Sequence, residues 1–234
     1  MELRKIFDTI PQQFDRYRPR YSAELFCDLI AWAGVGSGTT VLEIGPGTGQ
    51  ATDPILNTGC DYHAIELGEN LAEMMRKKYG HYSNFSIVND DFITYDFGDL
   101  RFDMIYSAAT IQWIPEEVAF PKIFSLLKPG GTLAMMLTRS DYRASNEHLY
   151  QKIQQIYSRW YKPEMPYQQR FCYGNATNWG FKDFEERRFS GTRVLDADAY
   201  VAYCGTHCDH MTIAQPQRTA FFDELRQLLF VAAS

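Results

Sequence analysis

The chain has 234 residues, of which 45% are hydrophobic and 22% are charged, and its formal net charge at pH 7 is −6. This length supports one sizeable core and favours a single domain over residues 1–234. The acidic balance argues against a nucleic-acid partner, because phosphate neutralisation needs clustered lysine and arginine. No apolar run approaches the ~18 to 20 residues that cross a bilayer, and residues 1–10 lack a signal-peptide core. We therefore expect a cytoplasmic protein with no membrane partner.

The first part of the chain alternates between strand and helix patterns. Ser22 is placed to cap a helix that Gly34 ends. The apolar, β-branched run 39–44 predicts a buried strand that leads into the tight turn Gly45-Pro46-Gly47-Thr48-Gly49 and a short helix to about residue 57. The alternation continues with strands at 62–67, 85–88, 102–107 and 132–137 and helices at 69–79 and 116–127.

This alternation predicts the fold class. Strands that alternate with helices pair in parallel through right-handed crossovers. We predict an α/β fold of the Rossmann-like, doubly wound kind, a mostly parallel sheet with helices on both faces. Lys128-Pro129-Gly130-Gly131 predicts a sharp turn between the last of these helices and the last strand. Further along, helices are expected at 147–160, near 198–208 and at 216–230, with a strand within 184–194.

The glycine-rich turn is the first sign of a ligand site. A strand that ends in such a turn and opens a helix lets a ligand approach bare backbone amides. The dinucleotide fingerprint G-x-G-x-x-G requires glycine where this chain has Gln50, which weakens a nicotinamide or flavin interpretation. Glu43 stands just before the turn, and Glu66 follows Gly45 by 21 residues. That spacing is close to the ~20 residues at which an acid reaches a ribose diol.

These motifs resemble the class I S-adenosylmethionine-dependent methyltransferases of small-molecule type, and distantly the trans-aconitate methyltransferases. The resemblance starts at Glu43 to Gly49, continues through Ala64-Ile65-Glu66-Leu67 and Val88-Asn89-Asp90-Asp91-Phe92, and includes the strand 102–107 and the Lys-Pro-Gly-Gly turn. It implies S-adenosyl-L-methionine as cofactor, S-adenosyl-L-homocysteine as product and a strand order of 3-2-1-4-5-7-6. The chain ends where a seventh strand is expected, so we expect either a sheet without that strand or a sheet completed in another way.

The resemblance also implies which residues hold the cofactor. Glu43 would lie near the methionine amine, Glu66 would accept from the ribose hydroxyls, and Asp91 would accept from the exocyclic amine of adenine, with Phe92 beside the ring and Asp90 as the fallback for Asp91. Solvated strand-end carboxylates remain the alternative for the two glutamates, and a turn-capping role the alternative for Asp91. The full expected set is Arg18, Glu43, Gly45, Gly47, Gly49, Glu66, Leu67, Asp91, Phe92 and Ser107.

The two ends of the chain are expected to contribute to the rest of the site. The resemblance implies that residues 1–21 form an N-terminal lid, in which Arg18 pairs with the methionine carboxylate and Tyr17 excludes water. The alternative is an ordinary surface turn that Pro19 sets. The aromatic-rich region 141–181 is expected to be an inserted segment on the acceptor side, although core packing is the favoured role for any single aromatic residue in it.

No residue is identified as catalytic from the sequence, and four are kept as candidates: Tyr17, Gln112, Trp113 and His207. Gln112 precedes Trp113 where relatives commonly have histidine, so a base at that position is absent here. Cys204 and Cys208 lie one helical turn apart, but no matching ligand pair stands upstream, so no metal is expected.

Together these observations predict methyl transfer from S-adenosylmethionine to a small-molecule acceptor by in-line displacement. A non-catalytic module that binds S-adenosylmethionine or S-adenosylhomocysteine is the first alternative, and an NAD(P)-dependent oxidoreductase is the second. The sequence leaves the acceptor and the oligomeric state open.

Overall fold

The computed structural model describes residues 2–141, 143, 146–168 and 170–233. The chain divides into two compact units. The first, which we call the sheet unit, comprises Pro19–Thr138 and Gln169–Gly191; the second, the flanking unit, comprises Met1–Arg18, Arg139–Gln168 and Thr192–Ser234. The expected acceptor-side region 141–181 is therefore split between the two units. A single domain over the whole chain stays a prediction.

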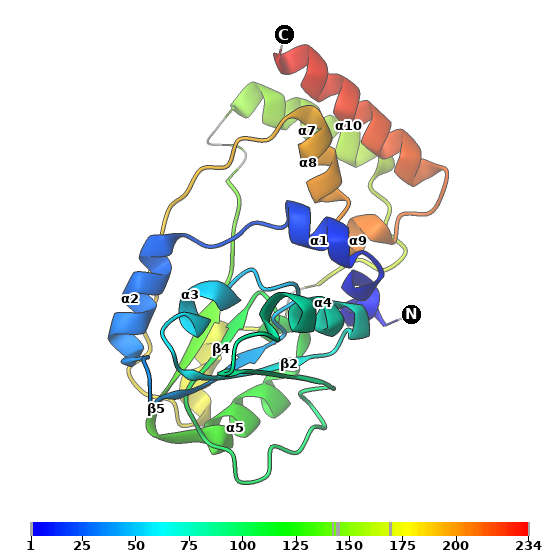
Figure 1. The fold of residues 1–234 in the computed structure, drawn as a ribbon. Coiled ribbons are helices and arrows are strands. Elements are labelled where there is room, and N and C mark those ends of the chain that lie inside the picture. The colour runs from blue at the N-terminus through cyan, green and yellow to red at the C-terminus, as the bar shows by residue number, and fades with distance from the viewer. Residues whose placement is uncertain (1, 142, 144–145, 169, 234) are drawn as a thin grey trace. The chain divides into compact units, whose positions relative to one another are not determined.

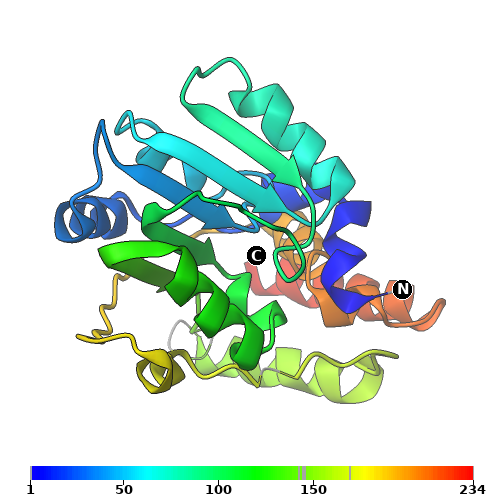
Figure 2. The ribbon, with the colours of Figure 1, turned by 90° about the horizontal axis from the view of Figure 1, so that it is seen from below.

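The sheet unit is built on a parallel sheet with the order β3-β2-β1-β4-β5 (Figures 1 and 2). Its strands are β1 (Thr40–Ile44), β2 (Asp61–Glu66), β3 (Phe85–Asn89), β4 (Phe102–Ala108) and β5 (Leu127–Met136). The predicted α/β, Rossmann-like fold is confirmed, and the five strands occupy the expected order.

Helices cover both faces of this sheet, as Figure 1 shows with α3 and α4 on one side and α5 on the other. The helices of the unit are α2 (Ala23–Ala33), α3 (Thr52–Leu56), α4 (Glu69–Tyr79) and α5 (Glu116–Leu126), with short 3-10 turns η2 (Ile111–Trp113) and η3 (Tyr173–Trp179). One apolar cluster joins the first three helices to the sheet, and a second joins α5 and η3 to the opposite face. The core therefore lies in two layers, one on each side of the sheet.

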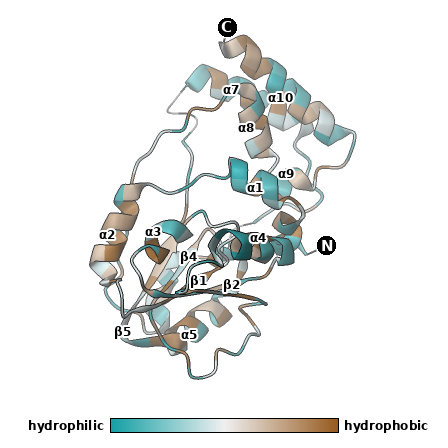
Figure 3. Cartoon of the chain, viewed as in Figure 1, coloured by the Kyte–Doolittle hydropathy of each residue, from teal (hydrophilic) through white to brown (hydrophobic). Residues whose placement is uncertain are grey.

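Local sequence explains where these helices begin, end and bury their apolar side. The Ser22 side chain accepts from the Leu25 amide at 3.3 Å, and Gly34 ends α2 with φ +62°. That left-handed conformation favours glycine. In α4, Met75 and Tyr79 are buried in the core, whereas the helix is mostly hydrophilic elsewhere (Figure 3).

The Lys-Pro-Gly-Gly segment is a strand irregularity rather than the separate turn that was predicted. β5 begins directly after α5, at Leu127, and pairs with β4 through Phe102↔Leu127 and then Met104↔Thr132. The extra residues on the β5 side form a bulge, and Gly130 supplies the φ of +80° that it needs. Regular pairing resumes at Thr132, which is where the sequence pattern placed the start of the strand.

The expected strand within 184–194 is wrong, because the described residues 182–196 form no helix or strand. Its apolar residues Phe184, Phe189 and Val194 are five positions apart rather than alternating, and no neighbouring strand pairs with this stretch. Phe184 is 45% exposed and Val194 is 92% exposed. Within the described residues the sheet therefore lacks both a sixth and a seventh strand.

The flanking unit is helical. It contains η1 (Leu3–Thr9), α1 (Pro11–Tyr17), α7 (Glu147–Trp160), α8 (Ala197–Cys204), α9 (Cys208–Met211) and α10 (Gln217–Ala233). α10 packs on α7 and α8, and the buried core of the unit is Ile153, Ile156, Val201, Ile213, Phe221 and Leu225. The sequence predicted the later helices but not η1 and α1. None of the described helices combines the length and the apolarity needed to cross a membrane.

Two phenylalanines on α10 test this core. Phe221 is fully buried and Phe230 is 54% exposed. We expect Phe221→Ala to lower the free energy of unfolding by about 3 to 5 kcal/mol, because it leaves a cavity, and Phe230→Ala to lower it by less than ~1 kcal/mol. Urea unfolding followed by circular dichroism measures both. Equal effects of the two substitutions would contradict the assignment of Phe221 to the core.

Candidate functional site

The candidate site lies at the carboxyl ends of the parallel strands, where β1 stands between β2 and β4. The chain leaves β1 toward one side of the sheet and later returns to β4 on the other side. In open α/β sheets this switch in strand order leaves a crevice at the carboxyl ends, and ligands bind there. The glycine-rich turn follows β1 directly at this position.

The turn conformation depends on its glycines. Gly45, Gly47 and Gly49 have φ values of +66°, +61° and +91°. A side chain at Gly45 would collide with Thr110, and a Cβ at Gly49 would lie 2.6 Å from the Tyr79 hydroxyl. Glycine at these two positions therefore serves both the backbone angles and the close packing around the turn.

Neighbouring side chains hold the turn in place. The Thr110 hydroxyl donates to the Gly45 carbonyl at 2.9 Å, which ties the turn to the loop after β4. Lys78 on α4 donates to the Thr48 carbonyl at 2.7 Å, and Arg20 donates to the Gly49 carbonyl at 3.1 Å. The turn is thus held by one residue that precedes it in the sequence and by two that follow it.

Glu66 connects the turn to the end of β2. Its Oε2 accepts from the Gly47 amide and its Oε1 from the Gly68 amide, both at 2.9 Å. The residue is only 6% exposed, so it is not a solvated strand-end carboxylate. A carboxylate has about four lone-pair sites on its two oxygens, so bonds from backbone amides do not by themselves exclude a bond from a ligand. Leu67, which follows directly, is partly buried.

Glu43 is fully buried beneath the turn rather than solvated. Its Oε2 accepts from the Thr52 hydroxyl at 2.6 Å and from the Tyr62 hydroxyl, which lies 2.5 Å from the Tyr106 hydroxyl. Burial raises the pKa of Glu43, and the hydrogen bonds from Thr52, Tyr62 and Tyr106 only partly oppose this. Its Oε1 is buried with no hydrogen-bond partner among the described residues.

Asp91 accepts a backbone hydrogen bond within the turn that follows β3. Its Oδ1 accepts from the Ile93 amide at 3.0 Å. The neighbouring Asp90 accepts from the Asp91 amide at 2.7 Å. Phe92 is 4% exposed and packs against Phe97 in the core. The proposed adenine contacts of Asp91 and Phe92 stay predictions.

The loop after β4 carries the remaining candidates of the sheet unit. Ser107 is buried and donates to the Ile44 carbonyl at 3.2 Å, so it ties β4 to β1. Gln112 donates its Nε2 to the Ala109 carbonyl at 2.8 Å, and its Oε1 is buried without a partner among the described residues. Trp113 is partly buried in η2.

Arg18, Tyr17 and His207 belong to the flanking unit, whereas the residues described above belong to the sheet unit. Arg18 donates to the Thr206 carbonyl at 2.7 Å and lies over the rings of Phe7 and Phe14, at 5.6 and 5.2 Å from their centroids. The Tyr17 carbonyl accepts from Arg193 at 2.6 Å. The lid and carboxylate-binding roles of these residues stay predictions.

His207 is held neutral in its surroundings. Burial lowers its pKa to about 3, and the Arg18 charge acts in the same direction. Its Nδ1 lies 3.1 Å from the Cys204 carbonyl. An imidazole with so low a pKa is a weak proton acceptor, so it is poorly matched to general-base catalysis near pH 7.

The sequence analysis missed a hydrogen-bond chain within the flanking unit. The Tyr157 hydroxyl lies 2.8 Å from His210 Nε2, and His210 Nδ1 lies 2.8 Å from Asp209 Oδ1. The other Asp209 oxygen accepts from Tyr161. Burial opposes ionisation of Asp209, but the bonds from His210 and Tyr161 outweigh it and lower its pKa. No local signal predicts this chain, because α7 and α9 are far apart in sequence.

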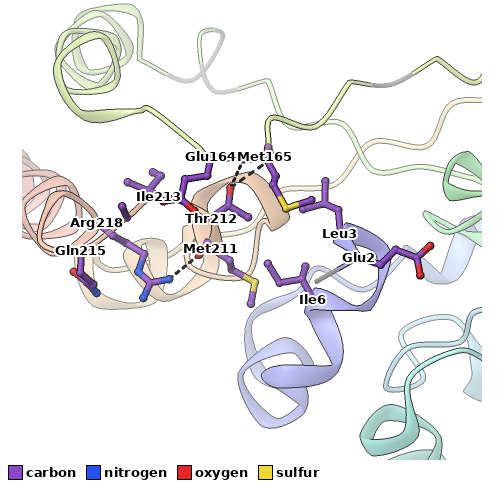
Figure 4. Close-up of a pocket in the computed structure, with 11 residues that line it drawn as sticks. Glu2, Leu3, Ile6, Glu164, Met165, Met211, Thr212, Ile213, Gln215 and Arg218 are labelled. Carbon is purple, nitrogen blue, oxygen red and sulfur yellow. Dashed lines mark hydrogen bonds between the residues drawn. The ribbon is translucent and has the colours of Figure 1, made fainter.

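A surface hollow of about 400 Å³ also lies within the flanking unit (Figure 4). Apolar side chains, among them Leu3, Ile6 and Met165, line it together with Arg218, which donates to the Met211 carbonyl at 2.7 Å. It contains none of the residues expected from the sequence to hold cofactor or to act in catalysis.

Comparison with known proteins identifies the domain. Residues 42–135, which include β1 to β5 almost completely, match the family model described as "Methyltransferase domain". The CcbJ methyltransferase from Streptomyces caelestis has the same fold, with a TM-score of 0.50, 22% identity and coverage of 58% of both chains. Residues 42–135 thus match a methyltransferase domain, in agreement with the resemblance seen in the sequence. The cofactor implied by the resemblance, S-adenosylmethionine, is that of the family.

Two curated relatives each match half of the chain or less. The ribosomal RNA small subunit methyltransferase A of Pseudomonas fluorescens is 32% identical over 100 residues, which are 43% of this chain and 36% of the relative. The sterol 24-C-methyltransferase of Eremothecium gossypii is 33% identical over 128 residues, covering 50% of this chain and 33% of the relative. The chain thus matches about a third of the length of these relatives.

The pKa shift of Glu43 predicts a pH dependence of stability. A carboxyl whose folded pKa lies above its unfolded value stabilises the fold below the unfolded pKa, and this contribution is lost as the pH rises through the folded pKa. In Glu43→Gln the amide oxygen can replace Oε2 and the amino group can replace Oε1, which mimics the protonated acid. We therefore expect the wild type to lose stability relative to Glu43→Gln as the pH rises above 4.5, the ordinary pKa of a glutamate carboxyl.

Urea unfolding at about pH 4.5 and about pH 7.5 measures this difference in free energy. Glu69→Gln, at the exposed start of α4, is the matched control and should show no such trend. A difference between the wild type and Glu43→Gln that stays constant with pH would contradict the prediction.

Proposed function

We propose that this protein transfers the methyl group of S-adenosylmethionine to a small-molecule acceptor by in-line displacement. The observation that carries the proposal is the position of Glu66, which is bound to the Gly47 and Gly68 amides at the strand-order switch. A carboxylate already aligned beside an open glycine turn is suited to receive a ribose diol. The match of residues 42–135 to the methyltransferase family supports the same function.

The residues present fit this cofactor. The Glu66 carboxylate is held at the glycine turn by the Gly47 and Gly68 amides, and the buried Glu43 Oε1 is an acceptor beneath the turn. We assign the ribose hydroxyls to Glu66, the methionine amine to Glu43 and the adenine amine to Asp91. Backbone at Gly45, Gly47 and Gly49, together with Leu67, Phe92 and Ser107, would form the surrounding walls.

The bound cofactor supplies a sulfonium whose methyl group is already activated for displacement. The protein's part is to hold cofactor and acceptor in line, with the reacting atoms ~3 Å apart, and to keep water out. The glycine turn and Glu66 would contribute to the alignment, because they would fix the adenosyl part of the cofactor. An acceptor that is nucleophilic without losing a proton needs no base.

We assign no general base. Gln112 has an amide that does not take up a proton, so it can orient a ligand only by hydrogen bonds through its buried Oε1. Trp113 has only an indole N–H donor. The low pKa of His207 makes it a poor base, and a role for Tyr17, Arg18 or the lid 1–21 remains part of the proposal.

A small-molecule acceptor is favoured over RNA by charge. The ribosomal RNA methyltransferase relatives leave RNA as the competing substrate class, but the net charge here is −6. Binding to a polyanion depends on released counterions and clustered cations. The net charge is consistent with an acceptor that is a carboxylate, an amine, a phenol or a carbon acid. We also propose that the reaction takes place in the cytoplasm.

A cofactor-binding measurement tests the role of Glu66. Glu66→Ala removes two hydrogen bonds to a charged acceptor and should raise the Kd for S-adenosylhomocysteine by roughly 30- to 1000-fold. Glu69→Ala, on the exposed first turn of α4, should leave the Kd within about threefold. Isothermal titration calorimetry gives both values. An unchanged Kd for Glu66→Ala would remove this residue from the site.

A transfer assay tests the function itself. With S-adenosylmethionine labelled in its methyl group, we expect label in at least one small carboxylate, amine or phenol and none in ribosomal RNA. Binding without transfer to any acceptor would instead favour the non-catalytic module. Tight NADH binding that Glu66→Ala leaves unchanged would favour the oxidoreductase.

A further inference from the structure

Lys122, on α5, binds the segment that follows β3. Its ammonium donates to the Ile93 carbonyl at 3.2 Å and to the Tyr95 carbonyl at 2.6 Å. It also lies over the rings of Phe92 and Phe97, 5.2 and 5.7 Å from their centroids. One cation thus satisfies two carbonyl groups and contacts two aromatic faces of the same short segment.

The residues that Lys122 binds are also the residues that fix Asp91. The Ile93 amide donates to the Asp91 carboxylate at 3.0 Å, and the Tyr95 amide donates to the Asp91 carbonyl at 2.9 Å. The position of the Asp91 side chain is therefore set through Ile93 and Tyr95. Their carbonyls are in turn held by Lys122.

The charges around Lys122 support this arrangement. Burial lowers the pKa of Lys122, whereas the carboxylates of Asp96, Asp91 and Asp90 favour the ammonium form. These acids are the charged groups that act on it from the segment after β3. A half-buried ammonium within an acidic loop stays in place because both its hydrogen bonds and these charges favour it.

We propose that Lys122 is a positioning residue, which holds Asp91 where it can accept a hydrogen bond from the exocyclic amine of adenine. This inference rests on the proposed function, since it concerns the adenine end of the same cofactor site. It gives α5 a part in selecting the nucleobase, although α5 lies on the opposite side of the sheet from α3 and α4. Lys122 itself does not touch the ligand.

The test compares two ligands that differ at the exocyclic group of the purine and in the proton on the neighbouring ring nitrogen N1. S-adenosylhomocysteine carries the amine, and S-inosylhomocysteine carries an oxygen there, which would face the Asp91 carboxylate as a second acceptor. We expect the wild type to bind the adenosyl compound at least about tenfold more tightly, because one hydrogen bond to a charged group is lost in the other.

Three variants separate positioning from general stability. Lys122→Met keeps an apolar stem over the Phe92 and Phe97 rings but loses the donors, so the ratio of the two Kd values should fall below about threefold. Lys122→Arg keeps donors for both carbonyls and should retain at least half of the wild-type ratio. Lys128→Met also loses a charge and an ion pair, with Asp103 near the start of β4, and should leave the ratio unchanged.

The outcomes distinguish this inference from the proposed function. If the wild type binds neither ligand, the proposed function fails. If the wild type discriminates and a folded Lys122→Met keeps the full ratio, the positioning role of Lys122 is wrong while the cofactor site stands. Equal binding of both ligands by the wild type would also overturn the inference, since Asp91 would then not read the amine.

Discussion

The site depends on the two amide hydrogen bonds that Glu66 accepts, from Gly47 and from Gly68. They join the turn after β1 to the end of β2, so the carboxyl ends of these two parallel strands are fixed relative to each other. The carboxylate is oriented before any ligand arrives, which reduces the ordering cost of binding. The positive φ angles of the glycines allow the backbone to reach it.

Beneath that surface lies a polar cluster that an apolar core does not need. Glu43, Thr52, Tyr62 and Tyr106 share hydrogen bonds in the buried layer between the sheet and α3. Burial raises the pKa of Glu43 and of both tyrosines. Burying such groups is costly unless they are paired, and these shared hydrogen bonds offset that cost directly under the turn.

The loops at the carboxyl ends of the strands are also held by hydrogen bonds from side chains elsewhere in the chain. Lys78 and Arg20 bind carbonyls of the glycine turn, and Lys122 binds carbonyls of the segment after β3. In each case a long cationic side chain from elsewhere in the chain satisfies loop carbonyls that no strand can pair. The loops at the carboxyl edge are thereby fixed without regular structure, which gives a ligand site a defined shape.

The sequence alone determined the alternation of strands and helices, the position of the glycine turn and the acids at the ends of β1, β2 and β3, because these follow from local periodicity and backbone angles. Tertiary structure decided that Tyr62 and Tyr106 meet Glu43, since only the register of β2 and β4 against β1 brings them together. It also decided that Lys-Pro-Gly-Gly is a bulge and that residues 184–194 form no strand. A strand exists only when a neighbour accepts and donates its backbone hydrogen bonds, and no local pattern specifies that neighbour.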